Sequence, residues 1–276
     1  MRIDFKINNR LVSFELEGET QVGGNEILLL EGENLIDQTD WSDVGFTIAP
    51  FLSLEEYESI RKGIKQLIIQ KIDEAGGKTD DEFTLENYHL YVNDEKHLDV
   101  AKRIQFGWDV CQFPIPIQRV NDRISSFLNQ AVTTKAKHID LNNFFVRIVR
   151  PSNLKDNNPP HRDVWLDRLR DAVNLYVPLC GSNEHSSLGV VAGSHLLQES
   201  SIERTAQGAI LNGTTYTVPS VISIMGEIPM LERPNPGENE MLLFSPYLVH
   251  GGGYNFNTDM TRISLEMRFW RKEDEK

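Results

Sequence analysis

RISLEMRF, residues 262–269, is the stretch of the sequence that decides the fold, because its polar and apolar side chains alternate strictly. Successive side chains of a β-strand point to opposite faces. One face therefore carries Ile, Leu, Met and Phe, and the other carries Arg, Ser, Glu and Arg. An edge strand with a solvated polar face is one interpretation. We favour a barrel strand whose polar face lines the interior and whose apolar face lies under a layer of helices.

The sequence around this strand predicts an all-β core preceded by helices. Strand-like runs separated by Gly, Pro and Asn turns cover 144–149, 172–179, 188–191, 215–218, 221–225, 241–244 and 263–270. Many short strands with turns between them are typical of a sandwich or jelly roll. Upstream, Ser53 and Glu56 form a capping box at the start of an amphipathic helix that ends near Gly76. Further helices are predicted over 96–104 and 117–131. We expect a double-stranded β-helix (jelly roll, cupin-like) flanked by N-terminal α-helices.

A single domain spanning residues 1–276 is the simplest organisation. Alternating residues on both sides of Asn8-Asn9 predict a β-hairpin within an N-terminal segment, 1–43. A mainly helical layer should occupy 44–135, and the jelly-roll core 136–276. The long, proline-containing stretch 196–240 is expected to include a lid or substrate loop as well as strands.

Composition narrows the classes of partner and compartment. The net charge of −13 argues against a nucleic-acid surface and against binding to anionic membranes. The sequence has no run that could span a membrane, and its polar start lacks the apolar core of a signal peptide. Two cysteines, Cys111 and Cys180, imply no disulfide framework and favour a reducing compartment. We therefore expect a cytoplasmic protein.

His161-Arg162-Asp163 and the distant His250 form a candidate metal site. A His and an Asp two residues apart on a strand point to the same face. A second His completes a facial triad that suits Fe(II), with three positions left for a cosubstrate and dioxygen. His-Xaa-Asp alone is a weak signal, since a lone His is usually a surface or core residue. The three glycines after His250 permit close backbone approach, although a flexible turn is the alternative.

Arg262 and Ser264 lie on the polar face of the predicted strand 262–269. A guanidinium inside the barrel can pair bidentately with a carboxylate, and a neighbouring hydroxyl can donate a second hydrogen bond. We therefore expect Arg262 to hold the far carboxylate of the cosubstrate, with Ser264 in support. Arg268 and Arg147 are the next candidates for this role.

The order of these motifs resembles the Fe(II)/2-oxoglutarate dioxygenases, specifically the phytanoyl-CoA dioxygenase-like superfamily. The resemblance covers roughly 44–270 and extends to the strand and helix over 45–61, the turn 187–195, Pro236-Gly237-Glu238 and Asn255. The N-terminal hairpin lies outside it, and Ala192 replaces a proline that is usual in that turn. The resemblance implies that His161, Asp163 and His250 are iron ligands and that Arg262 and Ser264 bind 2-oxoglutarate.

The resemblance also implies a reaction, in which 2-oxoglutarate and dioxygen are converted to succinate and carbon dioxide while a C–H bond is hydroxylated. Related halogenases lack the carboxylate ligand, so the presence of Asp163 favours hydroxylation. The substrate is expected to be a small molecule. Basic residues in an acidic protein favour an anionic one, although ordinary surface contacts are as good an explanation for most of them. The candidate pocket residues are Arg147, Arg150, Trp165, Arg168 and Arg268; for Trp165 we favour packing beside the metal ligands.

Two other functions fit the same motifs. A cupin-like metal-dependent sugar isomerase or epimerase would need the metal ligands but not Arg262. A non-catalytic jelly-roll binding protein would keep the fold without turnover. His195 is assigned to a structural turn because the triad is already complete. Ordinary surface or core roles are expected for the remaining histidines, His89, His97, His138 and His185.

Overall fold

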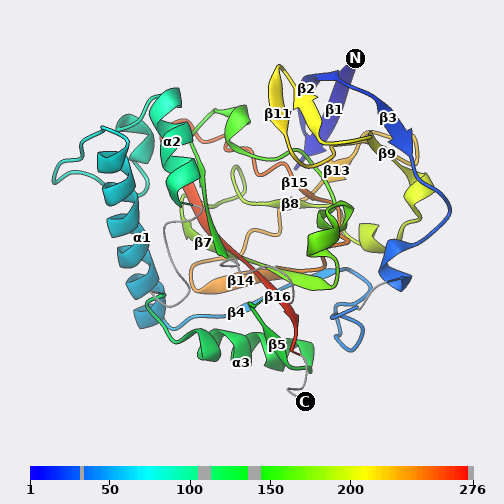
Figure 1. The fold of residues 1–276 in the computed structure, drawn as a ribbon, viewed down its shortest axis with the longest axis horizontal. Coiled ribbons are helices and arrows are strands. Elements are labelled where there is room, and N and C mark those ends of the chain that lie inside the picture. Colours follow the sequence, from blue (N-terminus) through cyan, green and yellow to red (C-terminus); the bar gives the residue numbers. More distant parts are fainter. Residues whose placement is uncertain (32–33, 105–112, 136–143, 273–276) are drawn as a thin grey trace.

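The computed structural model describes residues 1–31, 34–104, 113–135 and 144–272. Figure 1 shows its three parts: a central sheet, helices that cover one side of that sheet, and the N-terminal strands at the opposite end of the molecule. His138 and Cys111 lie outside the described residues. β15 (His250–Gly251) lies between the central sheet and the N-terminal strands (Figure 1).

The central sheet has the order β4-β14-β7-β16-β5, and β6 pairs with β16 as well. Its strands are β4 (Phe46–Pro50), β5 (Val132–Thr133), β6 (Phe144–Val149), β7 (Ala172–Cys180), β14 (Glu240–Phe244) and β16 (Arg262–Arg271). All pairings among them are antiparallel. β7 is buried along its whole length because the sheet is covered on both faces.

β16 places its two faces as the alternation predicts. Ile263, Leu265, Met267 and Phe269 are buried in the largest hydrophobic cluster, together with side chains of all three α-helices. The polar residues alternate with them and therefore point to the opposite face, where the cavity lies. The edge-strand interpretation is wrong, because β6 and β7 pair with β16 on its two sides.

Three helices form the layer under the apolar face of this sheet: α1 (Leu54–Glu74), α2 (Asp94–Ile104) and α3 (Ile117–Leu128). The capping box is confirmed, since Ser53 accepts from the Glu56 backbone and Glu56 accepts from the Ser53 backbone. α3 ends three residues before the predicted Ala131. Asn129 adopts a left-handed conformation with φ of 55°, which stops the helix there.

A smaller sheet faces the central one across the cavity. Its members are β8 (Gly189–Val190), β15 (His250–Gly251) and the single bridges His161–His250 and Val190–Glu232. Side chains of the two sheets meet in one cluster, where Leu188 and Val190 lie with Tyr176 and Phe244. Two facing antiparallel sheets with this strand connectivity form the predicted jelly-roll core, or double-stranded β-helix.

The N-terminal strands pair with the 196–240 segment, far away in the sequence. β1 (Arg2–Ile7) and β2 (Arg10–Glu17) form the predicted hairpin, with positive φ at Asn8 and Asn9. β1 also pairs with β13 in parallel, β2 with β10, and β3 with β9. These strands are β3 (Thr20–Val22), β9 (Ile202–Thr205), β10 (Ala209–Leu211), β11 (Thr214–Tyr216), β12 (Val221–Ile224) and β13 (Met230–Leu231). The strands predicted for this segment are confirmed, and its use as a lid stays a prediction.

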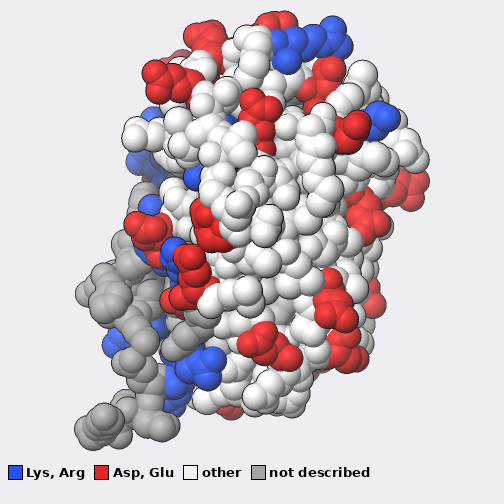
Figure 2. Space-filling model, turned by 90° about the vertical axis from the view of Figure 1, so that its right-hand side faces the viewer, with Lys and Arg blue, Asp and Glu red and all other residues white. Residues whose placement is uncertain are grey.

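The side of the molecule that carries β3 and β9 is shown as a surface in Figure 2. Uncharged side chains make up most of that face, and carboxylates are scattered over it. The net charge of −13 agrees with this distribution. Among the described residues, none of the helices has the length and apolar character needed to cross a membrane.

Candidate active site

Three predicted metal ligands converge in the structure. The Nε2 atom of His161 lies 3.3 Å from Oδ1 of Asp163, and Nε2 of His250 lies 3.8 Å from the same oxygen. One ligand atom from each residue lies within 4.8 Å of the others. All three side chains are buried. Two imidazole nitrogens and one carboxylate oxygen facing a common point are a donor set that fits Fe(II), so the residues present suit this metal.

The backbone positions these ligands by a bridge and a turn. The backbone N–H of each of His161 and His250 donates to the carbonyl of the other, at 2.8 and 2.9 Å. Asp163 opens the 3-10 helix η5 (Asp163–Trp165) and donates its N–H to Pro246 O. The expectation that His161 and Asp163 share one face of a strand is therefore wrong. The turn after the bridge brings the carboxylate beside the two imidazoles.

Both imidazoles are oriented by backbone carbonyls. Nδ1 of His161 lies 2.7 Å from Pro159 O, and Nδ1 of His250 lies 2.9 Å from Leu248 O. A proton on Nδ1 satisfies each carbonyl and leaves Nε2 as the lone-pair nitrogen that faces the other ligands. Burial, with a smaller effect from His161, lowers the pKa of His250 to about 4. This ring is therefore neutral at neutral pH, as metal binding requires.

Asp163 uses its two oxygens differently. Oδ2 accepts from Nε and Nη2 of Arg268, at 3.2 and 2.9 Å, and from Nδ2 of Asn174 at 3.0 Å. Arg268 and Asn174 are direct cross-strand partners on β16 and β7. Because three N–H groups occupy Oδ2, Oδ1 is the oxygen left to bind a metal. Neither the role of Arg268 nor that of Asn174 was predicted from the sequence.

The charges around Asp163 favour its ionised form. Burial alone would raise the pKa of this carboxyl, but Arg268 and the two imidazoles together hold it well below its usual range. A second buried carboxylate, Glu266, pairs with Arg147 at 3.3 and 3.4 Å. Burial would raise its pKa as well, and Arg147 reverses the effect and lowers it. Both carboxylates in the cavity are therefore anionic at neutral pH.

Arg262 and Ser264 are not in the wall of the cavity described below, and both have no solvent exposure. Nη1 of Arg262 donates to Ser264 Oγ at 3.2 Å and Nη2 donates to Gly253 O at 3.1 Å. Among the described residues no carboxylate pairs with this guanidinium, and its Nε has no hydrogen-bond partner. A buried arginine without a counterion is costly unless a ligand supplies the charge. Binding of an anion by this side chain stays a prediction.

Asn157 lies beside Arg262 and was not predicted as a site residue. A Cβ atom on Gly253 would lie 2.8 Å from Nδ2 of Asn157 and 3.1 Å from Nη2 of Arg262, so both side chains pack against this glycine. Nδ2 of Asn157 is buried and has no partner among the described residues. The Asn157-Asn158 pair is typical of a turn in the sequence, and only the fold reveals that it faces the cavity.

The cavity in front of the triad has a volume of about 290 Å³. It is walled by both sheets and by the 196–240 segment, which contributes Thr217 and Val218. The charged residues that line it are Arg147, Asp163, Arg168, Glu266 and Arg268, and the apolar ones include Phe145, Leu166, Leu169, Leu188, Phe244 and Met267. Three of the five residues predicted to face a pocket are therefore in its wall.

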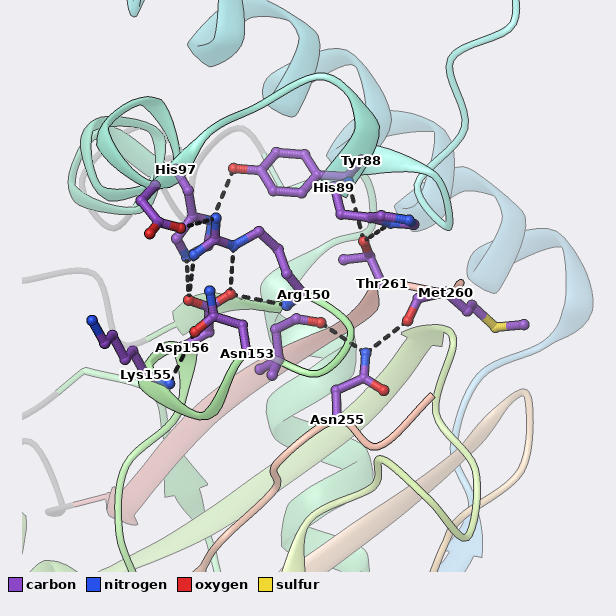
Figure 3. A network of polar contacts seen from close by, with 12 residues as sticks. Tyr88, His89, His97, Arg150, Asn153, Lys155, Asp156, Asn255, Met260 and Thr261 are labelled. Atoms are coloured by element: carbon purple, nitrogen blue, oxygen red, sulfur yellow. Dashed lines mark hydrogen bonds and ion pairs between the residues drawn. The ribbon is translucent and has the colours of Figure 1, made fainter. Parts of the chain in front are cut away.

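Arg150, the fourth, is held in a separate buried network (Figure 3). Its Nε and Nη2 donate to Asp156 at 2.7 and 2.8 Å, and its Nη1 donates to Asp94 at 2.7 Å. His97 lies 3.3 Å from Asp156, and Tyr88 contacts the same imidazole. The expectation that Arg150 faces the pocket is wrong. The network instead fixes the loop that precedes Asn157 and His161 against α2.

The other predicted residues have structural roles. Trp165, the fifth, donates from Nε1 to Glu199 Oε2 at 2.9 Å and packs in a cluster with Val249, the neighbour of His250. His195 is buried away from the triad with Nε2 2.7 Å from Ser42 O, as its assignment to a turn predicts. His89 contacts Thr261 and His185 is exposed.

Comparison with known protein families shows which family this chain belongs to. The profile described as phytanoyl-CoA dioxygenase (PhyH) matches residues 43–264, which is most of the sequence. The chain therefore belongs to the phytanoyl-CoA dioxygenase family. The predicted class of enzyme, a non-heme Fe(II)/2-oxoglutarate-dependent oxygenase, is confirmed, and so are its cofactors, Fe(II) and 2-oxoglutarate. The donor atoms of His161, Asp163 and His250 fit that metal, and their role as its ligands stays a prediction.

Solved structures show more distant likenesses. AviO1 from Streptomyces viridochromogenes Tue57 is 18% identical over 86% of this chain and 94% of its own, with a TM-score of 0.46. EctD from S. alaskensis, solved with 2-oxoglutarate and 5-hydroxyectoine, is 13% identical over 92% and 84%, with a TM-score of 0.47. SnoN, an α-ketoglutarate-dependent epimerase from nogalamycin biosynthesis, is 14% identical over 84% and 79%, with a TM-score of 0.40. No curated protein matches the sequence. Similarities this weak do not decide which reaction the chain catalyses.

Proposed function

We propose that this protein hydroxylates a C–H bond of a small molecule, with 2-oxoglutarate as cosubstrate. The observation that carries the proposal is the unequal use of the two Asp163 oxygens. Oδ1 lies with the two Nε2 atoms, while Oδ2 is held by Arg268 and Asn174. A carboxylate held in this way binds a metal through one oxygen. Three ligand atoms from the protein leave three positions for cosubstrate and dioxygen.

When bound, Fe(II) and 2-oxoglutarate supply the oxidising chemistry, and succinate and carbon dioxide are released. The chain supplies orientation and exclusion of water. His161 and His250 present Nε2 atoms whose direction is fixed by hydrogen bonds from Nδ1 to backbone carbonyls. Arg268 and Asn174 prevent Asp163 from turning toward the metal with both oxygens. Retention of this carboxylate supports hydroxylation, because a halogenase would need its place for a halide.

Arg262, with Ser264 in support, is the proposed site for the distal carboxylate of 2-oxoglutarate. Two facts favour it over Arg147 and Arg268. Those two arginines are already paired with Glu266 and Asp163, whereas Arg262 has no carboxylate partner among the described residues. Its Nη1 is already hydrogen-bonded to Ser264 Oγ, so one incoming carboxylate can contact both groups. The adjacent free amide of Asn157 is a further donor within the same region.

The balance of charge in the cavity supports an anionic substrate. Three arginines and two carboxylates line its wall. The charges of Fe(II) and of 2-oxoglutarate cancel each other, so binding both leaves the cavity with a positive excess. The protein as a whole carries −13. A local excess of the opposite sign attracts an anion more strongly than a neutral or cationic molecule.

The test begins without a known substrate. Anaerobic protein loaded with Fe(II) and 2-oxoglutarate should develop a weak visible charge-transfer band, and admission of air should release succinate slowly. Absence of both in correctly metallated protein contradicts the proposal. Conversion of a sugar without 2-oxoglutarate would instead support the isomerase or epimerase alternative. Ligand binding with no turnover of any kind would support the non-catalytic one. Residence in the cytoplasm stays a prediction, which fractionation of source cells can test.

A further inference from the structure

We propose that Arg168 is the anchor for an acidic group of the substrate, at the mouth of the cavity. The inference rests on the proposed function and adds the chemical class and orientation of the substrate. The substrate would be a small molecule with an apolar body and one anionic end. The anionic end lies at the mouth, and the carbon to be oxidised lies farther in, beside the triad.

Arg262 is set apart as the proposed anchor of 2-oxoglutarate, and the assignment follows from what four other arginines near the site contact. Arg147 pairs with Glu266, and Arg268 pairs with Asp163. Arg150 is held by Asp156 and Asp94, outside the cavity. Arg162 is fully buried against Glu199, also outside the cavity wall. Each of these guanidinium groups therefore has its charge matched by a carboxylate of the protein.

Arg168 differs from all of them. It lies in the 3-10 helix η6 (Asp167–Leu169), a few residues after Asp163, and it is exposed while also lining the cavity. In the described part of the chain it makes no ion pair and no side-chain hydrogen bond. Because Arg168 is exposed to solvent and also lines the cavity, it lies at the mouth of the cavity. Its five N–H donors are free for a carboxylate or phosphate.

The surroundings of Arg168 define the rest of the ligand. Leu166 and Leu169 flank it in the sequence and also line the cavity, and Phe145 lies in the same wall. An apolar body can pack against these side chains while its charged end reaches the guanidinium. The volume of about 290 Å³ is at the lower limit of typical ligand cavities, roughly 300–1,000 Å³. Because 2-oxoglutarate takes part of this space, the substrate body must be small.

Three probes of equal chain length test the headgroup directly: hexanoate, hexanamide and hexyl phosphate. Each is titrated calorimetrically into anaerobic enzyme that holds Fe(II) and 2-oxoglutarate, so that no turnover occurs. We expect at least one anionic probe to bind about tenfold or more tightly than the neutral amide. The better of the two anions identifies a carboxylate or a phosphate as the natural headgroup. In Arg168→Gln this preference should disappear, and in Arg168→Lys part of it should remain.

Arg170→Gln is the matched control, because Arg170 lies two residues away and does not line the cavity. Its ion pair with Glu31 is long, at 3.7 Å. This variant should keep the preference for an anion. The proposal is overturned if the amide binds as well as both anions, if the preference survives in Arg168→Gln, or if no probe binds. A weakened affinity for 2-oxoglutarate in Arg168→Gln would also overturn it, by assigning Arg168 to the cosubstrate. Failure of the proposed function is distinct, because wild-type enzyme would then show neither the anaerobic charge-transfer band nor succinate release in air.

Discussion

The Arg150 network and the wall of the cavity are two clusters of charged residues that differ in whether those charges are fully paired within the protein. In the network, all three nitrogens of the Arg150 guanidinium donate to carboxylates, and His97 adds a further contact to Asp156. In the cavity wall, Oδ1 of Asp163 is left open and Arg168 has no carboxylate partner among the described residues. We call a cluster closed when its charges are fully paired within the protein and open when some are not. Closed clusters stabilise the fold, whereas open ones leave groups available to bind ligands.

The largest effect is expected from removing the Asp163 carboxylate, whose Oδ1 is left open in the cavity wall. Asp163→Ala should abolish succinate release, because the metal loses one of three protein ligands and Arg268 loses its partner. 2-Oxoglutarate binding to the protein can persist through Arg262. The measurement is succinate formation with and without candidate substrates. Asp167→Ala, an exposed carboxylate in the next turn, is the control and should remain active; full activity in Asp163→Ala would disprove the ligand assignment.

Substitutions in the Arg150 network should change the free energy of unfolding. Asp156→Asn leaves the buried Arg150 guanidinium poorly compensated, and we expect it to lower the free energy of unfolding by about 3 kcal/mol. Urea denaturation measures the loss. Asp94→Asn removes the other carboxylate from the same guanidinium, but the Asp94 side chain is 76% exposed. Its loss should cost under about 1 kcal/mol. Equal costs for the two variants would show that burial does not separate these clusters.

Arg262 shares one property with each cluster. It is fully buried, like Arg150, but no carboxylate of the described residues pairs with it, as for Arg168. Arg262→Ala should weaken 2-oxoglutarate binding by about 1.5–3 kcal/mol, which is roughly 10- to 150-fold. The concentration of 2-oxoglutarate that gives half of the anaerobic charge-transfer band measures this change. An unchanged requirement would move the anchor to Arg268 or Arg147.

The last prediction concerns a second group of paired charges, at the start of α1. Arg123 is the main cause that lowers the pKa of Glu56 to about 2, against the opposing effect of burial, and the Ser53 cap and Arg119 contribute. A lowered carboxyl pKa stabilises the fold above the unfolded value of about 4.5, and this contribution is lost as the pH falls toward 2. Glu56→Gln should therefore cost about 1–2 kcal/mol at pH 7 and progressively less below pH 4.5. Urea titrations at several pH values test this, and a constant difference would contradict it.

The sequence predicts the metal ligands but not the groups that hold them. His161, Asp163, His250 and Arg262 form a recognisable order along the chain, and the alternation in 262–269 identifies the polar face. The bond from Asn174 to Asp163 depends instead on the register between β7 and β16. A register shift between Ile263 and Ser264 sets which residue lies opposite Arg268. Such a shift has no signature in either strand alone.

The same limit applies to the arginines. Arg147, Arg150, Arg168 and Arg268 are equivalent candidates in the sequence, because residue type does not reveal which carboxylate lies nearby. Tertiary contacts within the described residues separate them into three paired guanidinium groups and one free group.

The N-terminal hairpin also has one feature that the sequence reveals and one that it does not. Its turn at Asn8-Asn9 is readable locally, whereas its pairing with β10 and β13 joins residues that are about 200 positions apart.

That pairing has a consequence for synthesis on the ribosome. β1, β2 and β3 emerge first, but their partners β13, β10 and β9 follow only after some 180 to 220 further residues. During that interval the edges of the hairpin carry unpaired backbone groups, which are a template for association with other chains. Contacts of such long sequence separation also slow folding. The folding of these N-terminal strands therefore depends on synthesis of their partners in the segment 202–231.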